Sequence, residues 1–307
     1  MSRKISIIGA GNVGTATLFA LALSGTAEEL VLLDHNLAKA EGEVMDLEHG
    51  SPFLPAVQLT ATNNYKAIAK SDIVIITAGA KQAKGETRLD LLQRNAATIK
   101  AIVRDVKRYA PNTILLIVAN PVDVLTYLAY KYSGFPKQRV IGSGTVLDTA
   151  RFRSALGKHF QINPHNVHAY ILGEHGDSSF PVLSTADIGS VPLTKLAGYN
   201  NKKIKHLHQQ VVHAAYTVIQ KKGATNSAIA ICVNQLARAI LNNTREVFSV
   251  SSVLQGEYGL RNVALNTPSV LGHHGIEREL ILPLNAQEKA ALKKSATVLK
   301  QAIVSIN

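Results

Sequence analysis

The sequence predicts an α/β protein in which a doubly wound parallel sheet is followed by a second, mixed α+β domain. In residues 1–142, short apolar runs alternate with longer segments of helical pattern. After residue 142 this alternation stops, and long helical patterns surround an irregular, strand-rich middle. The length of 307 residues agrees with two domains, at about 150 residues each. The predicted division is therefore 1–142 and 143–307.

The strands of the first domain are predicted from four apolar runs rich in β-branched residues. Such runs are typical of strands that are buried on both faces of a parallel sheet. They span 5–9, 30–34, 73–77 and 114–120. The segments between and after them are long enough for crossover helices, at 12–24, 38–49, 88–109 and 122–132. Repeated strand and helix of this kind indicates a doubly wound sheet.

The second domain is predicted mainly from its helices. Helical patterns cover 147–159, 201–222, 225–243 and 286–305. No internal repeat, low-complexity tract or Gly/Ser linker separates the two halves. We therefore expect the two domains to share one tight interface.

The composition narrows the possible classes of function but does not decide between them. The 33 Lys and Arg against 21 Asp and Glu give a net charge of +12, which suits nucleic acid, an anionic membrane surface or small anionic ligands. The densest basic stretch, 202–208, has no interleaved aromatic residues for base stacking. The single cysteine, Cys232, cannot form an internal disulfide, and no apolar run approaches the roughly 20 residues of a membrane span. We expect a soluble cytoplasmic protein.

A glycine motif follows the first predicted strand. Gly9, Gly11 and Gly14 provide a tight turn, close backbone approach to a pyrophosphate, and close packing of helix on strand. Asp34 ends the second predicted strand 25 residues after Gly9, where a carboxylate can accept hydrogen bonds from both ribose hydroxyls. A carboxylate there repels a 2′-phosphate, so the motif predicts NAD rather than NADP.

A candidate for proton transfer is His175, which lies in the glycine-flanked segment LGEHGDS at 172–178. A histidine suits proton transfer near neutral pH when a carboxylate fixes its tautomer and favours its charged form. Asp148 is the candidate carboxylate. Taken alone, a histidine in a loop is more often a structural or surface residue. No spacing of histidines and cysteines resembles a metal site.

Six segments resemble the lactate and malate dehydrogenase family, and most closely its bacterial L-lactate dehydrogenases. They are IIGAGNVG (7–14), ITAGAKQAKGETRLDLLQRN (76–95), VANPVDVLTY (118–127), SGFPKQRVIGSGTVLDTARFR (133–153), HAYILGEHGDSSFPV (168–182) and KKGAT (221–225). The resemblance implies a Rossmann domain followed by a catalytic domain, usually assembled as a homotetramer or homodimer. It also implies reversible hydride transfer between NADH and pyruvate, giving lactate and NAD, in glycolysis and fermentation.

The resemblance implies roles for particular residues. It assigns His175 as the proton donor and acceptor and pairs Asp148 with its imidazole. It makes Arg151 the anchor of the substrate carboxylate, since a guanidinium can donate two parallel hydrogen bonds. It makes Arg88 the residue that closes over the substrate and polarises its carbonyl. Further substrate contacts are implied for Asn120 and Thr225.

Gln82 matches the position that separates the substrates of this family. An uncharged amide tolerates the methyl group of pyruvate, whereas malate dehydrogenases carry an arginine there to pair with a second carboxylate. Lys81 and Lys84 are close in sequence and could accept a dicarboxylate in part. The resemblance thus favours an L-lactate dehydrogenase, with a malate or broader L-2-hydroxyacid dehydrogenase as the alternative. Residues 79–88 resemble the mobile loop that covers the active site.

The resemblance also implies ligand contacts outside the reacting centre. The matched cofactor positions are Gly9, Gly11, Val13, Gly14, Asp34, Lys39, Tyr65, Gly79, Ala80, Val118, Asn120 and Ser143. A solvated Lys39 and a packed Tyr65 are the alternatives at two of them. Arg153 and His168 match the positions through which regulated bacterial relatives bind fructose bisphosphate between subunits. An inert anion site between subunits is the alternative there.

Overall fold

The computed structural model describes residues 3–80 and 87–306, apart from the side chain of Arg88. The first half contains β1 (Lys4–Ile8), α1 (Asn12–Ser24), β2 (Glu29–Leu33), α2 (Leu37–His49), β3 (Gln58–Thr62), β4 (Ile73–Ile76), α3 (Arg88–Tyr109), β5 (Ile114–Ile117), α4 (Val122–Ser133) and β6 (Val140–Gly142). The second half contains α5 (Val146–Phe160), β7 (Val167–Leu172), β8 (Phe180–Ile188), β9 (Val191–Pro192), α6 (Asn201–Lys222), α7 (Ser227–Leu241), β10 (Val247–Gln255), β11 (Arg261–Gly272), β12 (Gly275–Glu279) and α8 (Ala286–Val304).

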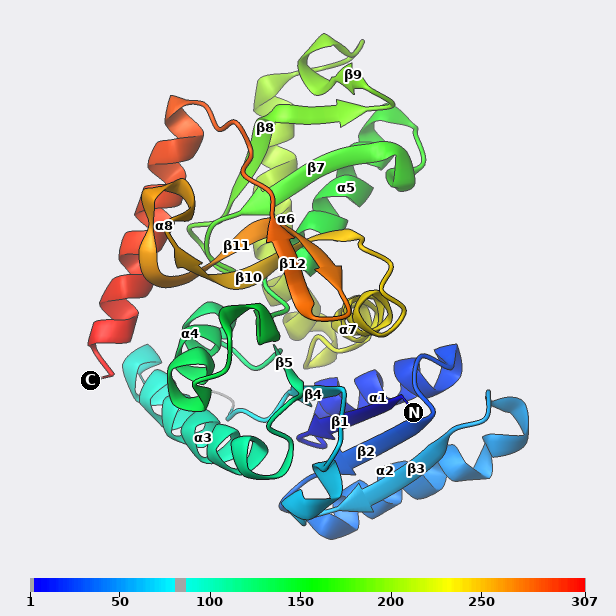
Figure 1. Ribbon diagram of the computed structural model, residues 1–307. Helices are drawn as coiled ribbons and strands as arrows, with labels where there is room; N and C mark the ends of the chain where they lie inside the picture. Colours follow the sequence, from blue (N-terminus) through cyan, green and yellow to red (C-terminus); the bar gives the residue numbers. More distant parts are fainter. Residues whose placement is uncertain (1–2, 81–86, 307) are drawn as a thin grey trace.

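The main sheet runs across both halves of the chain (Figure 1). Within the described residues it has nine strands, in the order β12-β11-β10-β6-β5-β4-β1-β2-β3. The six strands from β6 to β3 are parallel, which confirms the predicted parallel, Rossmann-type sheet. β1, β2, β4 and β5 were predicted from the sequence, whereas β3 and β6 were not. β10 joins this sheet antiparallel to β6, with Ser251 opposite Gly142. The sheet therefore continues past residue 142 into the second half.

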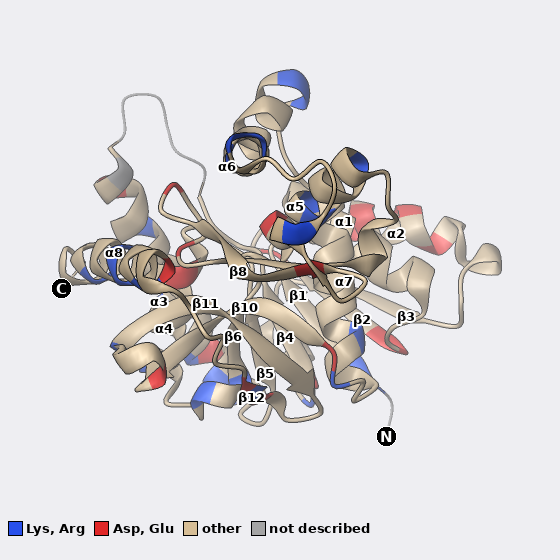
Figure 2. Cartoon of the chain, turned by 90° about the horizontal axis from the view of Figure 1, so that it is seen from above, with Lys and Arg blue, Asp and Glu red and all other residues tan. Residues whose placement is uncertain are grey.

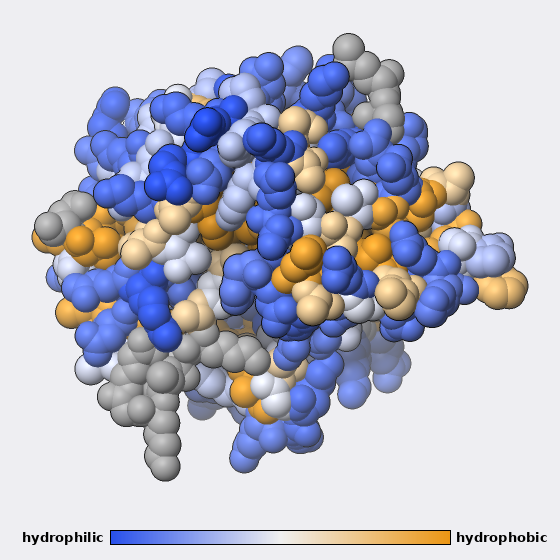
Figure 3. Space-filling model, turned by 90° about the horizontal axis from the view of Figure 1, so that it is seen from below, coloured by the Kyte–Doolittle hydropathy of each residue, from blue (hydrophilic) through white to orange (hydrophobic). Residues whose placement is uncertain are grey.

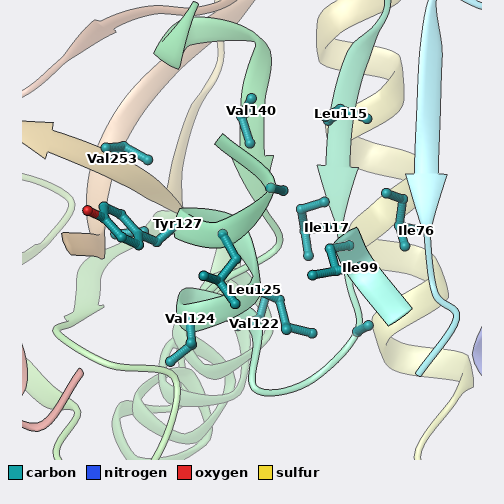
Figure 4. Close-up of a cluster of buried hydrophobic side chains, with 14 of the residues drawn as sticks. Ile76, Ile99, Leu115, Ile117, Val122, Val124, Leu125, Tyr127, Val140 and Val253 are labelled. Atoms are coloured by element: carbon teal, nitrogen blue, oxygen red, sulfur yellow. The ribbon is translucent and has the colours of Figure 1, made fainter. Parts of the chain in front are cut away.

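The parallel strands are buried on both faces, which explains their apolar sequence. Along β4, Ile73 and Ile75 pack into a cluster that includes side chains of α1 and α7. Val74 and Ile76 point the other way, into a cluster with side chains of α3 and α4 (Figure 4). Since successive residues of a strand alternate between faces, helices on both sides are needed to cover such a run.

A smaller antiparallel sheet, β7-β8-β9, lies at the top of Figure 1 and meets the main sheet where Gly173, directly after β7, bridges Asn266 of β11. A third buried cluster fills the space between this sheet and helices α5 and α6, with Phe152, Leu156, Ile171 and Ile204 at its centre. α5 thereby lies against β7. α5 carries Asp148 and Arg151, and the loop after β7 carries the predicted proton donor, His175. The lysines and arginines are distributed over several elements, among them α5, α6 and α8 (Figure 2).

Candidate active site

The glycine turn lies between β1 and α1, at the carboxyl edge of the parallel sheet. Gly9 has φ +112°, and a Cβ there would lie 2.7 Å from the backbone nitrogen of Ala78. A Cβ on Gly14 would overlap the carbonyl oxygen of Gly9. Around Gly11 no described atom lies within 4 Å of such a Cβ. Two glycines thus satisfy packing, while the third leaves open backbone at the amino end of α1, where a phosphate group can bind.

Asp34 lies beside this turn, directly after β2. One oxygen of its carboxylate accepts the backbone N–H of Ala10 at 2.6 Å, and the other accepts the backbone N–H of Asn36 at 2.9 Å. Its side chain is only 11% exposed, so the carboxylate is fixed in place. Oδ1 also lies 3.0 Å from Nδ1 of the exposed His35, while Oδ2 has a second lone pair with which it can accept a hydroxyl hydrogen. The pair of turn and carboxylate therefore fits the pyrophosphate and ribose of NAD.

Lys39 and Tyr65 differ in their surroundings. Lys39 is exposed on α2. Tyr65 is half-buried against the α3 and α4 side of the core. Burial, together with the charge of Asp105, raises the pKa of Tyr65 to about 12. Tyr65 is thus a neutral, packed residue in this structure.

The other predicted cofactor residues lie at the carboxyl ends of the central strands. Gly79 and Ala80 follow β4, Val118 and Asn120 follow β5, and Ser143 follows β6. Two of these loops are tied together by Asn95, a buried residue of α3 that sequence analysis did not single out. Its side chain accepts the N–H of Ala80 at 2.8 Å and donates to the carbonyl of Asn120 at 2.9 Å. An asparagine on the apolar face of a predicted helix was the available signal.

The structure joins His175 to Asp148, as predicted. Nδ1 of His175, in the loop after β7, lies 2.6 Å from Oδ2 of Asp148 on α5. The other oxygen of Asp148 accepts Nη1–H of Arg151 at 3.1 Å, one turn later on the same helix. The side chain of His175 is 28% exposed. With Nδ1 held by a carboxylate, Nε2 is the ring atom that can exchange a proton with a bound molecule.

The surroundings of His175 set its protonation. Burial lowers the pKa of the imidazole, but the charge and hydrogen bond of Asp148, aided by the charge of Asp123, outweigh it and raise the pKa to about 8. Burial raises the pKa of Asp148, and the charges of His175 and Arg151 hold it below its usual value. Near neutral pH the pair is therefore an imidazolium beside a carboxylate.

The other predicted substrate residues lie outside the hydrogen-bonded group of His175, Asp148 and Arg151, or outside the described residues. Thr225 is half-buried in the turn between α6 and α7, and Asn120 lies at the end of β5. Within the described residues, neither is hydrogen-bonded to His175 or Asp148. Arg88 is the first residue of α3, and its side chain lies outside the described part of the chain. Gln82, Lys81 and Lys84 also lie outside the described residues.

Two further residues support the histidine loop and were missed by sequence analysis. Asp123 of α4 accepts the backbone N–H of His175 at 2.6 Å, and Asn266 of β11 donates to Asp123 at 3.0 Å. Burial raises the pKa of Asp123 to about 6, although Ser251 and the backbone N–H of His175 lower it. An acidic residue inside the apolar helix VDVLTYLAY was the available signal.

The predicted anion residues lie away from this centre. Arg153 donates through Nη2 to the carbonyls of Pro164 and His165, at 3.3 and 3.2 Å. His168 is exposed on β7, the strand against which α5 packs. The two residues thus belong to adjacent elements, and no hydrogen bond between them is present in the described structure.

A cavity of about 830 Å³ lies at the opposite, amino edge of β4 and β5. Its lining includes Asp72, Ile114, Arg139 and His273, and none of the predicted site residues.

Outside residues 1–2, 81–86 and 307, no group of histidine, cysteine and acidic side chains is arranged to hold a metal. Over the same residues, none of the helices has the length and apolar character to cross a bilayer. Cys232 is buried in α7, which raises the pKa of its thiol to about 11.

Comparison with known proteins gives matches along the whole chain. Residues 3–142 match the model for the lactate/malate dehydrogenase NAD-binding domain, and residues 145–307 match that for the α/β C-terminal domain. L-lactate dehydrogenase 1 of Clostridium acetobutylicum is 49% identical, over 99% of this chain and 98% of its own. The L-lactate dehydrogenase of Acetivibrio thermocellus is 46% identical, with the same coverage.

Two solved structures are similar over their full length. One is the crystal structure of MGS-M5, a lactate dehydrogenase enzyme from a deep-sea metagenome library, with a TM-score of 0.96 and 40% identity. The other is the minor L-lactate dehydrogenase from Enterococcus mundtii, with a TM-score of 0.96 and 37% identity. Each comparison covers 100% of this chain and 99% of the other.

Proposed function

This chain belongs to the lactate/malate dehydrogenase family, and on that basis we propose a role in catalysis or binding for each of its site residues. It is an NAD-dependent oxidoreductase with the activity of an L-lactate dehydrogenase. Pyruvate and NADH are converted reversibly into lactate and NAD. The observation that carries the residue assignment is the 2.6 Å contact between His175 and Asp148, with Arg151 on the same carboxylate.

NAD is expected at the carboxyl edge of the parallel sheet, in a first domain of residues 1–142. The open backbone at Gly11 and the fixed carboxylate of Asp34 support this placement. When bound, NADH supplies the hydride for the keto carbon of pyruvate. Residues 143–307 are proposed as the catalytic domain, which contributes the groups that hold pyruvate and move the proton.

His175 gives its Nε2 proton to the oxygen of pyruvate as negative charge develops there. Asp148 keeps the imidazole oriented and protonated near neutral pH, and it compensates the charge of the ring before the transfer. In the reverse direction, the neutral imidazole removes the hydroxyl proton of lactate. The proton therefore moves at one atom in both directions.

Arg151 binds the carboxylate of pyruvate. Its guanidinium has five N–H donors, of which one is held by Asp148, so the fork is oriented before the substrate arrives. From the family pattern, we propose that Arg88 polarises the carbonyl, that Asn120 and Thr225 contact the substrate, and that Gln82 favours pyruvate over oxaloacetate.

A homotetramer, or else a homodimer, is proposed as the working assembly. Large apolar side chains are exposed on neighbouring elements of one region, on α1, on α2 and the turn after it, and on α7: Phe19, Leu23, Met45, Phe53 and Ile231. α1 packs against α7 in the chain. Such a group of exposed apolar residues favours burial against another subunit. A cytoplasmic location and a role in glycolysis and fermentation are proposed on the family pattern alone.

Steady-state kinetics with NADH and pyruvate, oxaloacetate or 2-ketoisocaproate test the proposed substrate. We expect kcat/KM to be highest for pyruvate. A clear preference for oxaloacetate would instead indicate a malate dehydrogenase, and a preference for 2-ketoisocaproate a broader 2-hydroxyacid dehydrogenase.

Regulation is tested separately. We propose that Arg153 and His168 bind a sugar bisphosphate, because both side chains can donate to a phosphate. Activity at subsaturating pyruvate should then rise as fructose bisphosphate is added. A flat response would reject allosteric activation and leave an inert anion site.

A further inference from the structure

We propose that Asp123 is a second carboxylate of the proton-transfer site, a positioning residue that holds His175 by its backbone and favours the protonated imidazole by its charge. The proposal rests on the proposed function, in which His175 exchanges the proton. It adds a residue on a different element from Asp148, since Asp123 belongs to α4 and Asp148 to α5. His175 is thereby held from two sides.

Each oxygen of the Asp123 carboxylate accepts one hydrogen bond. Oδ2 accepts the N–H of His175 at 2.6 Å, and Oδ1 accepts Nδ2–H of Asn266 at 3.0 Å. Asp123 is 2% exposed and Asn266 is fully buried. Both partners are donors, so the arrangement suits an ionised carboxylate, whereas a protonated one would turn its own O–H toward a donor. A buried carboxylate with two such partners is a built feature of the fold rather than a surface residue.

Asn266 extends this support to both members of the catalytic pair. Its Nδ2 also donates to the carbonyl of Gly173 at 2.7 Å, two residues before His175. Its Oδ1 accepts the N–H of Thr145 at 2.9 Å, three residues before Asp148. The side chains of Asp123 and Asn266 therefore fix the two chain segments that carry the imidazole and its carboxylate.

The charges around His175 determine in which direction the loss of the Asp123 charge changes the pKa of the imidazole. Asp148 and Asp123 both raise the pKa of the imidazole, while burial and the charge of Arg151 lower it. Three other titratable groups interact electrostatically with the carboxylates of this site: Glu174 in the same loop with Asp123, and His208 on α6 and Cys232 on α7 with Asp148. Because Asp148 remains, removing the charge of Asp123 lowers the pKa of His175 without abolishing the pair.

The test is Asp123→Asn, compared with the unaltered chain and with Asp46→Asn, the same change at an exposed position of α2. The first readout is kcat/KM for pyruvate against pH at saturating NADH. We expect its falling limb to move to lower pH by about 1 unit in Asp123→Asn, the lower end of the effect of a nearby opposite charge. We expect no shift in Asp46→Asn. An unshifted limb in Asp123→Asn would overturn the electrostatic part of the proposal.

A second readout does not depend on turnover. The imidazole of His175 can be titrated by NMR, with its signal identified by its absence in His175→Asn. The signal should titrate at lower pH in Asp123→Asn than in the unaltered chain, and equal values would contradict the proposal. If the unaltered chain does not reduce pyruvate, the proposed function fails, yet this titration still decides the role of Asp123.

A further variant separates position from charge and serves if Asp123→Asn does not fold. Asn266→Ala keeps the carboxylate of Asp123 but removes the amide that donates to Asp123 and Gly173 and accepts from Thr145. We expect kcat to fall by at least about 10-fold, the effect of losing these hydrogen bonds, with the falling limb moved less than in Asp123→Asn. An unchanged kcat would overturn the positioning role.

Discussion

At the scale of single residues, the site depends on one carboxylate that serves two partners. Asp148 accepts from His175 with one oxygen and from Arg151 with the other. The proposed proton donor and the proposed carboxylate anchor are therefore oriented relative to each other before any substrate binds. Such preorganisation lowers the cost of assembling the site during the reaction.

Replacing His175 by alanine removes the proposed proton donor and little else, because the backbone N–H that Asp123 accepts is retained. We expect turnover to fall by about 10²–10⁴-fold, the range for loss of a general acid. NADH binding, followed by its fluorescence, should remain nearly intact. Loss of NADH binding in this variant would mean that the histidine has a structural role.

Arg151→Lys keeps the positive charge but removes the planar fork. We expect KM for pyruvate to rise by about 10–100-fold, which corresponds to one charge-assisted hydrogen bond, with a smaller effect on kcat. The control is Arg238→Lys, an arginine of α7 that lies 3.6 Å from Glu246 at the surface. Equal KM values for the two variants would exclude Arg151 as the carboxylate anchor.

At the scale of elements, the sequence is informative where burial imposes a strong pattern. Helices α1, α3 and α6 begin and end at the predicted residues, and each of the four predicted strands is present with slightly different ends. β3 was not predicted because it lies at the edge of the sheet and is only partly buried, so its sequence QLTAT is largely polar. The pairing of β10 with β6 joins residues about a hundred positions apart, which local patterns do not reveal.

In the candidate site, too, the sequence predicts what depends on local pattern and misses what depends on the packing of distant segments. The spacing of Asp148 and Arg151 places them on one side of a helix, and the glycine motif defines its own turn. The contact between His175 and Asp148 depends on the packing of β7 against α5. Asp148 was a candidate on its residue type alone, and the family resemblance then implied the same pairing. Asp123 and Asn266 were missed because their role depends on four separate segments that meet only in the folded chain.

The glycine turn offers a matched pair of substitutions. Gly14→Ala places a methyl group onto the carbonyl of Gly9, so we expect stability to fall by about 1–3 kcal/mol. Gly11→Ala meets no described atom within 4 Å, so thermal unfolding should be nearly unchanged while NADH binding weakens. Thermal unfolding and NADH fluorescence distinguish the two. Equal destabilisation by both substitutions, or normal NADH binding by Gly11→Ala, would contradict the proposed role of the turn.

At the scale of the whole molecule, the surface combines a positive net charge with exposed apolar residues. The charge of +12 is carried by lysines and arginines on several elements, rather than by a single basic stripe (Figure 2). Seen from below, hydrophobic patches are mixed with hydrophilic residues (Figure 3). The proposed contacts with the anionic substrate and effector involve only a few of these positive charges, and nothing in the structure explains the remainder.

The proposed assembly is tested by Ile231→Glu, which places a charge on an α7 side chain that is 59% exposed. We expect the sedimentation coefficient to fall to that of a smaller species, because a buried unpaired charge disfavours an interface. Val304→Glu is the control, since Val304 is 72% exposed at the end of α8. Unchanged sedimentation of the Ile231 variant would place the subunit interface elsewhere.

The most direct test of the account is the pH dependence of the reaction in both directions. Since the pKa of His175 is raised to about 8, the imidazole is protonated below that pH and neutral above it. With NADH and pyruvate, kcat/KM should be constant at lower pH and fall as pH rises through about 8. With NAD and lactate, kcat/KM should rise over the same range. If both directions changed with pH in the same sense, or neither changed near pH 8, His175 would not be the group that moves the proton.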